Sequence, residues 1–412
     1  MDRPHTSLRV AARSKIGWLA GKLSRVTSTG ELIPEVDGLR FIAISAVLFH
    51  HLMAMFLSGS GRSPEVRTYA EWFAAADQSW LVIPAYCGHF GVNLFFVISG
   101  FILALPFARR AFNGQAAPDL KSYYLRRVTR IEPPYLLSLI VIFLIHWKQW
   151  GSGYGPRLVP NLIASLFYSH GLVYGRESAI NGVAWSLEIE IQFYLVTPLL
   201  VRLFRLRNVA ARRSLIVALI VGFGLLSQWV IYPSGSARLP LTLLNFAHYF
   251  LTGFLLVDFY LTGRLRAADK RPAWDLATLA GAAAIFATLS RFGQFYYLLP
   301  LMVGLLYAGF FLGRLSNAFA RARWITIIGG MCYTIYLYHI LIISNLMAQT
   351  MPVASIARPF NLDFALQCML IMPMVLAVCA LLFFYAEKPF MRWSLSPRPV
   401  KASEAEPVLA GD

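Results

Sequence analysis

Residues 41–57, FIAISAVLFHHLMAMFL, form an apolar segment that contains no Asp, Glu, Lys or Arg. A helix that crosses a bilayer needs about 20 predominantly apolar residues, and the neighbouring residues 38–40 extend this segment to that length. Similar segments recur along the chain, which is 58% hydrophobic and 14% charged, whereas a soluble domain carries about 25% charged residues. The sequence therefore predicts an all-α fold, a polytopic bundle of transmembrane helices embedded in the lipid bilayer.

About ten spans are predicted, within one transmembrane domain at 37–391 that is flanked by polar tails at 1–36 and 392–412. With both tails in the cytoplasm, most of the 37 Lys and Arg residues fall in cytoplasmic segments, as the positive-inside rule expects. Residues 160–173 are interpreted as a re-entrant or interfacial helix, because counting them as a span would put a cluster of arginines outside. The loop 151–181 is then predicted to lie outside. The predicted spans are 38–57, 88–107, 133–148, 183–203, 214–232, 240–261, 273–290, 294–313, 324–347 and 363–385.

The net charge of +17 does not indicate a nucleic-acid partner, because basic residues of membrane proteins collect in cytoplasmic loops. The four cysteines show no CxxC or other metal-type spacing. We therefore expect neither a disulfide nor a metal site.

The first span carries two titratable groups on one stripe. Arg40 and His51 are eleven residues apart, which returns a helix to within about 20° of its starting direction. His50 lies about 80° off that face. Ionisable groups inside a membrane are costly and are functional hypotheses by default. The pattern favours a polar path that runs inward from the cytoplasm, against the alternatives of a snorkelling arginine and a hydrogen-bonded core histidine.

A basic cluster, Arg126, Arg127 and Arg130, precedes the third span. Arg127 and Arg130 are i, i+3 neighbours in a helix, and two guanidinium groups on one face suit a phosphorylated ligand. The alternative is ordinary cytoplasmic positive charge. Further along, Glu190 and His339 lie in the predicted outer halves of their spans, where each needs a polar partner.

Together, these segments resemble the acyltransferase-3 family of membrane acyltransferases, which includes bacterial O-antigen and exopolysaccharide O-acetylases. Six elements, in the family's order, carry the resemblance from about residue 35 to residue 393. One departure is Cys332, where the family usually has Ser. The matching residues are Asp37, Gly38, Leu39 and Arg40 with His50 and His51; Ser99 and Gly100 within FFVISGF; Arg127, Arg130, Ile131 and Pro133; Trp185, Ser186, Leu187, Glu190, Phe193, Tyr194 and Pro198; Tyr333, Tyr336, Leu337 and His339; and Glu387, Lys388 and Pro389.

The resemblance implies O-acylation in a bacterial plasma (inner) membrane. An acyl group, usually acetyl, passes from cytoplasmic acyl-CoA to a hydroxyl of a carbohydrate or glycoside. We expect Arg126, Arg127 and Arg130 to hold the CoA phosphates and Arg40 to line the entry. We expect His51 to act as the general base.

Several alternatives stay open at this point. His50 is the other candidate base, and a covalent acyl-histidine competes with direct transfer. Glu190 and His339 are expected to orient the acceptor or His51. A secondary transporter with an intramembrane His, Glu and Arg relay is the competing function, although no internal repeat of the kind common in transporters is visible. The sequence identifies neither the acceptor, the acyl chain length nor the oligomeric state.

Overall fold

The computed structural model describes residues 32–60, 68–114, 119–265, 269–351 and 359–393, together with Gly21 and Leu23; the side chains of residues 150–157 and 392–393 are not among those described. The described residues form helices joined by turns and irregular segments, with no strand among them. This agrees with the predicted all-α class.

Long α-helices carry most of the structure. They are α2 (Pro34–Gly59), α5 (Gly91–Asn113), α6 (Leu120–Leu166), α8 (Trp185–Leu200), α9 (Val209–Leu226), α10 (Leu243–Leu261), α11 (Pro272–Ser290), α12 (Leu299–Leu312), α15 (Cys332–Thr350) and α16 (Phe360–Leu382). Shorter helices are α3 (Tyr69–Ala75), α4 (Val82–Cys87), α7 (His170–Tyr174), α13 (Leu315–Ala320), α14 (Arg323–Gly330) and α17 (Lys388–Trp393). Short 3₁₀ or π turns extend several of these helices, among them η1 (Gly88–Phe90), η2 (Gly182–Ala184), η3 (Val201–Arg205) and η6 (Leu239–Leu241).

Eight helical segments of the described chain are long and apolar enough to cross a membrane, and nine if α14 and α15, which meet at an angle of 70°, form one bent span. The predicted span at 183–203 is not among them, so the expectation of ten is one too many by this criterion. Its α-helix, α8, has 16 residues, about 24 Å of rise against a hydrocarbon core of roughly 30 Å. The polar residues Glu188, Glu190 and Gln192 further reduce its apolar character.

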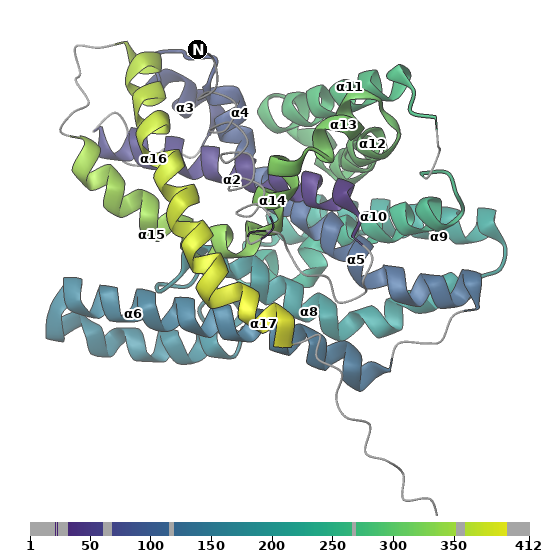
Figure 1. The fold of residues 1–412 in the computed structure, drawn as a ribbon, viewed down its shortest axis with the longest axis horizontal. Coiled ribbons are helices and arrows are strands. Elements are labelled where there is room, and N and C mark those ends of the chain that lie inside the picture. The colour runs from purple at the N-terminus through teal and green to yellow at the C-terminus, as the bar shows by residue number, and fades with distance from the viewer. Residues whose placement is uncertain are drawn as a thin grey trace, which may run out of the picture.

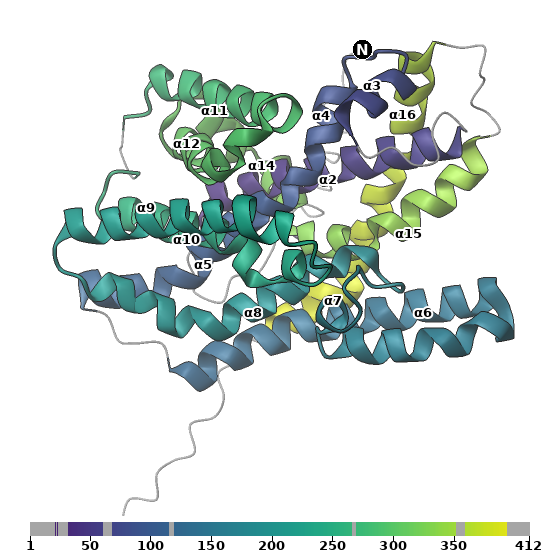
Figure 2. The same cartoon turned by 180° about the vertical axis from the view of Figure 1, so that it is seen from behind.

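Helix α6 doubles back on itself, as both ribbon views show (Figures 1 and 2). The Tyr135 hydroxyl donates a hydrogen bond of 3.0 Å to the Ser165 carbonyl oxygen, thirty residues further along the chain. A straight helix would separate those residues by about 45 Å. The predicted loop 151–181 therefore contains the returning arm of α6 and then α7. An arm that returns beside the span fits the re-entrant interpretation of residues 160–173.

The centre of the molecule is formed by α2, α5 and α10 (Figure 1). Helices α5 and α10 approach closely because each presents a glycine to the other. A Cβ atom on Gly100 would overlap the Phe250 carbonyl oxygen, and one on Gly253 would overlap the Val97 carbonyl oxygen. Small residues allow such close backbone contact between membrane helices. Gly100, which the family motif singled out, therefore has a packing role.

Candidate functional site

Two cavities adjoin near the middle of the molecule. One, here called the basic cavity, has a volume of about 420 Å³ and is lined by Arg40, Arg126, Arg127 and Arg130, among others. The other, here called the histidine cavity, has a volume of about 590 Å³, and its lining includes His50, His51, His89 and His248. Val92 and Tyr336 line both cavities. The two spaces therefore share a wall.

Helix α2 reaches both cavities. Arg40, near its beginning, lines the basic cavity, whereas His51, three turns further on, lines the histidine cavity. The Arg40 guanidinium forms a 2.6 Å ion pair with Asp37, which holds the arginine against its own helix. The stripe predicted from the sequence thus links the two spaces.

His51 is hydrogen-bonded to a second histidine from the far end of the sequence. Its Nδ1 lies 3.1 Å from His339 Nε2, and His339 Nδ1 lies 2.9 Å from the carbonyl oxygens of both Ile335 and Tyr336. A carbonyl can only accept a hydrogen bond, so His339 Nδ1 must carry a proton. In neutral His339, Nε2 is then the acceptor, and His51 Nδ1 donates to it. This assignment leaves His51 Nε2 unprotonated, as a general base requires.

His50 has different surroundings. Its ring stacks on Trp72 with centroids 5.1 Å apart and an interplanar angle of 11°, and its Nδ1 lies 3.0 Å from the Ala85 carbonyl oxygen. His89, from η1, lies beside it with ring centroids 5.6 Å apart. Sequence reasoning missed His89, although a titratable residue inside the predicted span 88–107 was a signal that could have found it.

The arginines of the basic cavity differ in how they are bound. Arg127 Nη1 donates to the Tyr123 carbonyl oxygen at 2.7 Å, and its guanidinium lies 3.5 Å from the centroid of the Tyr123 ring. Arg126 and Arg130, one helical turn apart, have no hydrogen-bond or ion-pair partner within the described residues. Arg127 still lines the cavity, and its Nε is buried without a hydrogen-bond partner among the described residues. Arg126 and Arg130 have all of their guanidinium donors free to meet an anion.

Glu190 lies in the basic cavity and does not line the histidine cavity. Its Oε1 accepts hydrogen bonds from Ser99 Oγ at 2.7 Å and from the Tyr194 hydroxyl at 2.6 Å. The structure therefore brings His339 to His51 but places Glu190 elsewhere. The sequence position of Glu190 predicted how deep in the membrane the residue lies. It could not predict which of the two cavities the side chain of Glu190 faces.

The remaining motif residues form packing contacts and hydrogen bonds between the segments around the two cavities. Trp185 packs on Phe246 beside the histidine cavity, and the hydroxyls of Ser186 and Tyr336 are hydrogen-bonded at 3.1 Å. Tyr333 donates to the Ile131 carbonyl oxygen at 3.0 Å. Other motif contacts are those of Glu387 with the Thr334 amide at 3.1 Å and of Lys388 with the Gly21 carbonyl oxygen at 3.4 Å.

A family model described as an acyltransferase domain matches residues 33–384, which include both members of the histidine pair and the arginines of the basic cavity. The chain belongs to the acyltransferase-3 family. This acyltransferase-3 chain is an integral membrane protein with multiple apolar spanning helices.

Relatives of this acyltransferase-3 chain are bacterial O-acetyltransferases. Peptidoglycan O-acetyltransferase OatA of Listeria monocytogenes is 27% identical over 364 residues, which is 79% of this chain and 51% of the relative. O-acetyltransferase OatA of Staphylococcus aureus is 27% identical over 213 residues, covering 47% of this chain and 29% of the relative. A putative peptidoglycan O-acetyltransferase of Bacillus subtilis, YrhL, is 26% identical over 228 residues, covering 49% of this chain and 29% of the relative. The chain thus matches between 29% and 51% of the length of these relatives. No solved structure matches it.

Proposed function

We propose that this protein is a membrane O-acyltransferase that transfers an acyl group, most simply acetyl, from acyl-CoA to a hydroxyl of a carbohydrate or glycoside acceptor. The observation that carries the proposal is the shared wall between the two cavities. Guanidinium groups with no partner among the described residues line the basic cavity, and His51, which is hydrogen-bonded to His339, lines the histidine cavity on the other side of the wall. Family membership supports an acyl donor, and the names of the relatives support a hydroxyl acceptor.

The basic cavity is the proposed donor site. CoA carries several phosphate charges, and guanidinium groups bind phosphate through charge-assisted hydrogen bonds. Arg126 and Arg130 are free for that purpose. The acyl end of the donor would reach the wall at Val92 and Tyr336. The proposal requires no metal ion, in line with the expectation from the sequence.

The proposed chemistry takes place at His51. Its Nε2 removes the proton of the acceptor hydroxyl as that oxygen attacks the thioester carbonyl carbon. The C–S bond then breaks, the new ester forms, and the CoA thiolate leaves and takes up the proton from His51, which restores the neutral base. His339 stabilises the transient charge on His51 by accepting the Nδ1 hydrogen bond. Direct transfer needs no acyl-histidine intermediate.

The test uses membranes from cells that express the protein, incubated with radiolabelled acetyl-CoA. We expect label in the carbohydrate fraction that mild alkali releases, because O-esters are alkali-labile. A His51→Gln variant at equal abundance should lose this label. Equal labelling by wild-type and variant membranes would contradict the proposal, and so would label that resists alkali.

A further inference from the structure

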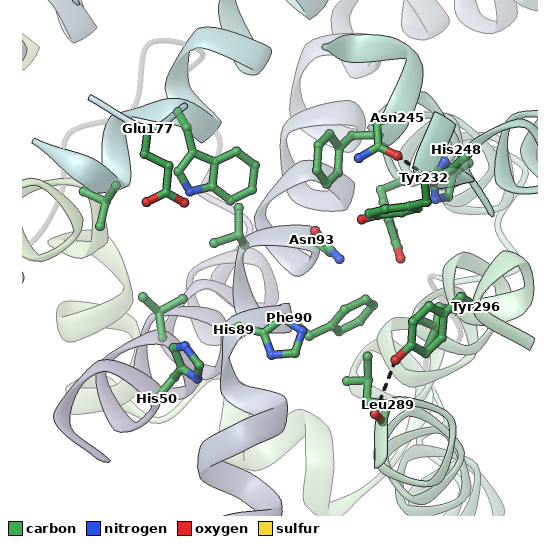
Figure 3. Close-up of a pocket in the computed structure, with 18 of the residues that line it drawn as sticks. His50, His89, Phe90, Asn93, Glu177, Tyr232, Asn245, His248, Leu289 and Tyr296 are labelled. Atoms are coloured by element: carbon green, nitrogen blue, oxygen red, sulfur yellow. Dashed lines mark hydrogen bonds between the residues drawn. The ribbon is translucent and has the colours of Figure 1, made fainter. Parts of the chain in front are cut away.

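The histidine cavity extends well beyond the proposed reacting group. In Figure 3, Glu177 and His50 lie at one end, whereas His248 and Tyr296 lie at the other. Its volume of about 590 Å³ lies within the range of small-molecule sites, roughly 300–1,000 Å³. A single hydroxyl beside His51 therefore occupies only one end of the available space.

His248, on α10, is an unsatisfied buried group at the far end. The residue is 3% exposed, and its ring Nδ1 is buried without a hydrogen-bond partner. No hydrogen bond of the other ring nitrogen, Nε2, is found within the described part of the chain. Buried polar groups in native proteins are nearly always hydrogen-bonded, so an exception requires a reason. An imidazole in the wall of a cavity can complete its hydrogen bonding with a ligand.

The neighbouring Asn245 shows the contrast. It lies one turn earlier on α10 and lines the same cavity. Its Nδ2 donates to the Pro240 carbonyl oxygen at 3.0 Å, and its Oδ1 accepts from Ser227 Oγ at 2.6 Å. The protein thus satisfies Asn245 internally and leaves His248 unpaired.

The charges around the cavity indicate the class of ligand. Among the described residues that line it, Glu177 is the only one of the Asp, Glu, Lys and Arg types, and it lies at the end opposite His248. No lysine or arginine among the residues that the structure describes lines the cavity to pair with an anion, in contrast to the basic cavity. The rings of Tyr232, Tyr249 and Tyr296 offer both apolar faces and hydroxyl groups. This lining suits an uncharged, hydroxyl-bearing group.

We propose that the His248 end is a distal acceptor subsite. It binds an uncharged, hydroxyl-bearing ring of the acceptor, one unit away from the hydroxyl that receives the acyl group at His51. His248 donates or accepts a hydrogen bond to a hydroxyl of that ring, and is a positioning residue for the acceptor. The inference rests on the proposed acyl transfer. It adds that two neighbouring units of the acceptor occupy the cavity.

The test compares two neutral probes, methyl β-glucoside and methyl β-cellobioside, as acceptors for purified protein supplied with acetyl-CoA. The release of free CoA thiol is the readout. We expect the KM for the cellobioside to be about threefold to tenfold lower than the KM for the glucoside. This is the range that one neutral hydrogen bond supplies. His248→Phe, which keeps a ring of similar size, should raise the KM for the cellobioside by about the same factor. It should leave kcat and the KM for the glucoside unchanged.

Two further variants sharpen the result. His248→Gln retains hydrogen-bonding groups and should recover part of the loss, whereas His146→Phe, a histidine outside the lining of both cavities, should match wild type. Equal use of both probes by wild-type protein would overturn the subsite, as would an equal loss of activity toward both probes in His248→Phe. Failure to use either probe by protein that still binds acetyl-CoA would also overturn it. Failure to bind acetyl-CoA at all would instead contradict the proposed function.

Discussion

At the scale of single residues, the hydrogen bonds around His339 fix the protonation of its neighbour. Two backbone carbonyls hold the proton on His339 Nδ1, and the remaining nitrogen faces His51. The arrangement supplies His51 with an acceptor for its Nδ1–H, the role that a carboxylate or carbonyl has in many histidine-based sites. It costs no buried charge in the resting state.

We expect His51→Gln to reduce kcat by about 10²–10⁴, the usual contribution of a general base. His339→Gln should reduce it by less, because it removes the orienting partner and leaves the base. His50→Gln should retain most of the activity, since His50 is held by Trp72 and the Ala85 carbonyl oxygen instead. Initial rates of CoA release measure all three, with thermal unfolding as the control for folding. Loss of activity in His50→Gln but not in His51→Gln would make His50 the base.

The sequence predicted individual polar residues better than their partners. His51 and Arg40 followed from helical spacing, because three turns of one helix keep a common face. The contact between His51 and His339 joins residues 288 positions apart, and no local pattern encodes it. Arg127 was predicted to hold the phosphates of a ligand, and it lines the basic cavity, but the spacing did not indicate that its guanidinium also packs on the ring of Tyr123, one turn earlier. Side-chain direction within a basic cluster depends on neighbours that spacing alone does not reveal.

At the scale of helices, hydropathy located the spans, because each must match the thickness of the bilayer. It did not show where α6 reverses: of the two arms that the hydrogen bond from Tyr135 to Ser165 joins, only Leu120–Gln149 is long and apolar enough to span the membrane. Hydropathy also predicted a span at α8 that the structure does not support. The acidic residues of α8 form hydrogen bonds to other parts of the protein. The Glu188 carboxylate, for example, accepts a hydrogen bond from the Gly171 amide at 2.9 Å and so anchors α7. The polar residues of α8 thus tie neighbouring segments together.

The close contact of α5 with α10 gives a prediction at this scale. Gly253→Val should destabilise the protein by about 1–3 kcal/mol or more, because the added side chain overlaps backbone atoms of α5. Gly222→Val, on α9 with no atom within 4 Å of the added Cβ, is the matched control. Thermal unfolding of the purified variants in detergent measures both. An unchanged Gly253→Val midpoint would show that α5 and α10 separate without cost.

At the scale of the whole molecule, charge divides the interior into two regions. Among the described residues, four arginines line the basic cavity, whereas the histidine cavity is lined by a single carboxylate and by no lysine or arginine. This division matches a polyanionic donor on one side of the wall and an uncharged acceptor on the other. The orientation in the membrane, with both termini in the cytoplasm, stays a prediction from the distribution of basic residues.

Cysteine accessibility in intact cells tests that orientation. A cysteine at Ala211, near the beginning of α9, should resist a membrane-impermeant thiol reagent, whereas one at Arg176, between α7 and α8, should react. The unsubstituted protein gives the background from the four native cysteines. The reverse labelling pattern would invert the predicted orientation.

The central claim is that the basic cavity binds the acyl-CoA donor, and calorimetric titration of acetyl-CoA into the purified protein tests it most directly. Each charge-assisted hydrogen bond is worth about 1.5–3 kcal/mol, or roughly 10- to 150-fold in affinity. We predict that wild-type protein binds acetyl-CoA and that Arg126→Gln and Arg130→Gln each weaken binding by at least about tenfold. Arg205→Gln, an exposed arginine outside both cavities, should bind like wild type. Wild-type protein that binds no acetyl-CoA, or Arg126→Gln and Arg130→Gln variants that bind it as tightly as wild type, would contradict the account.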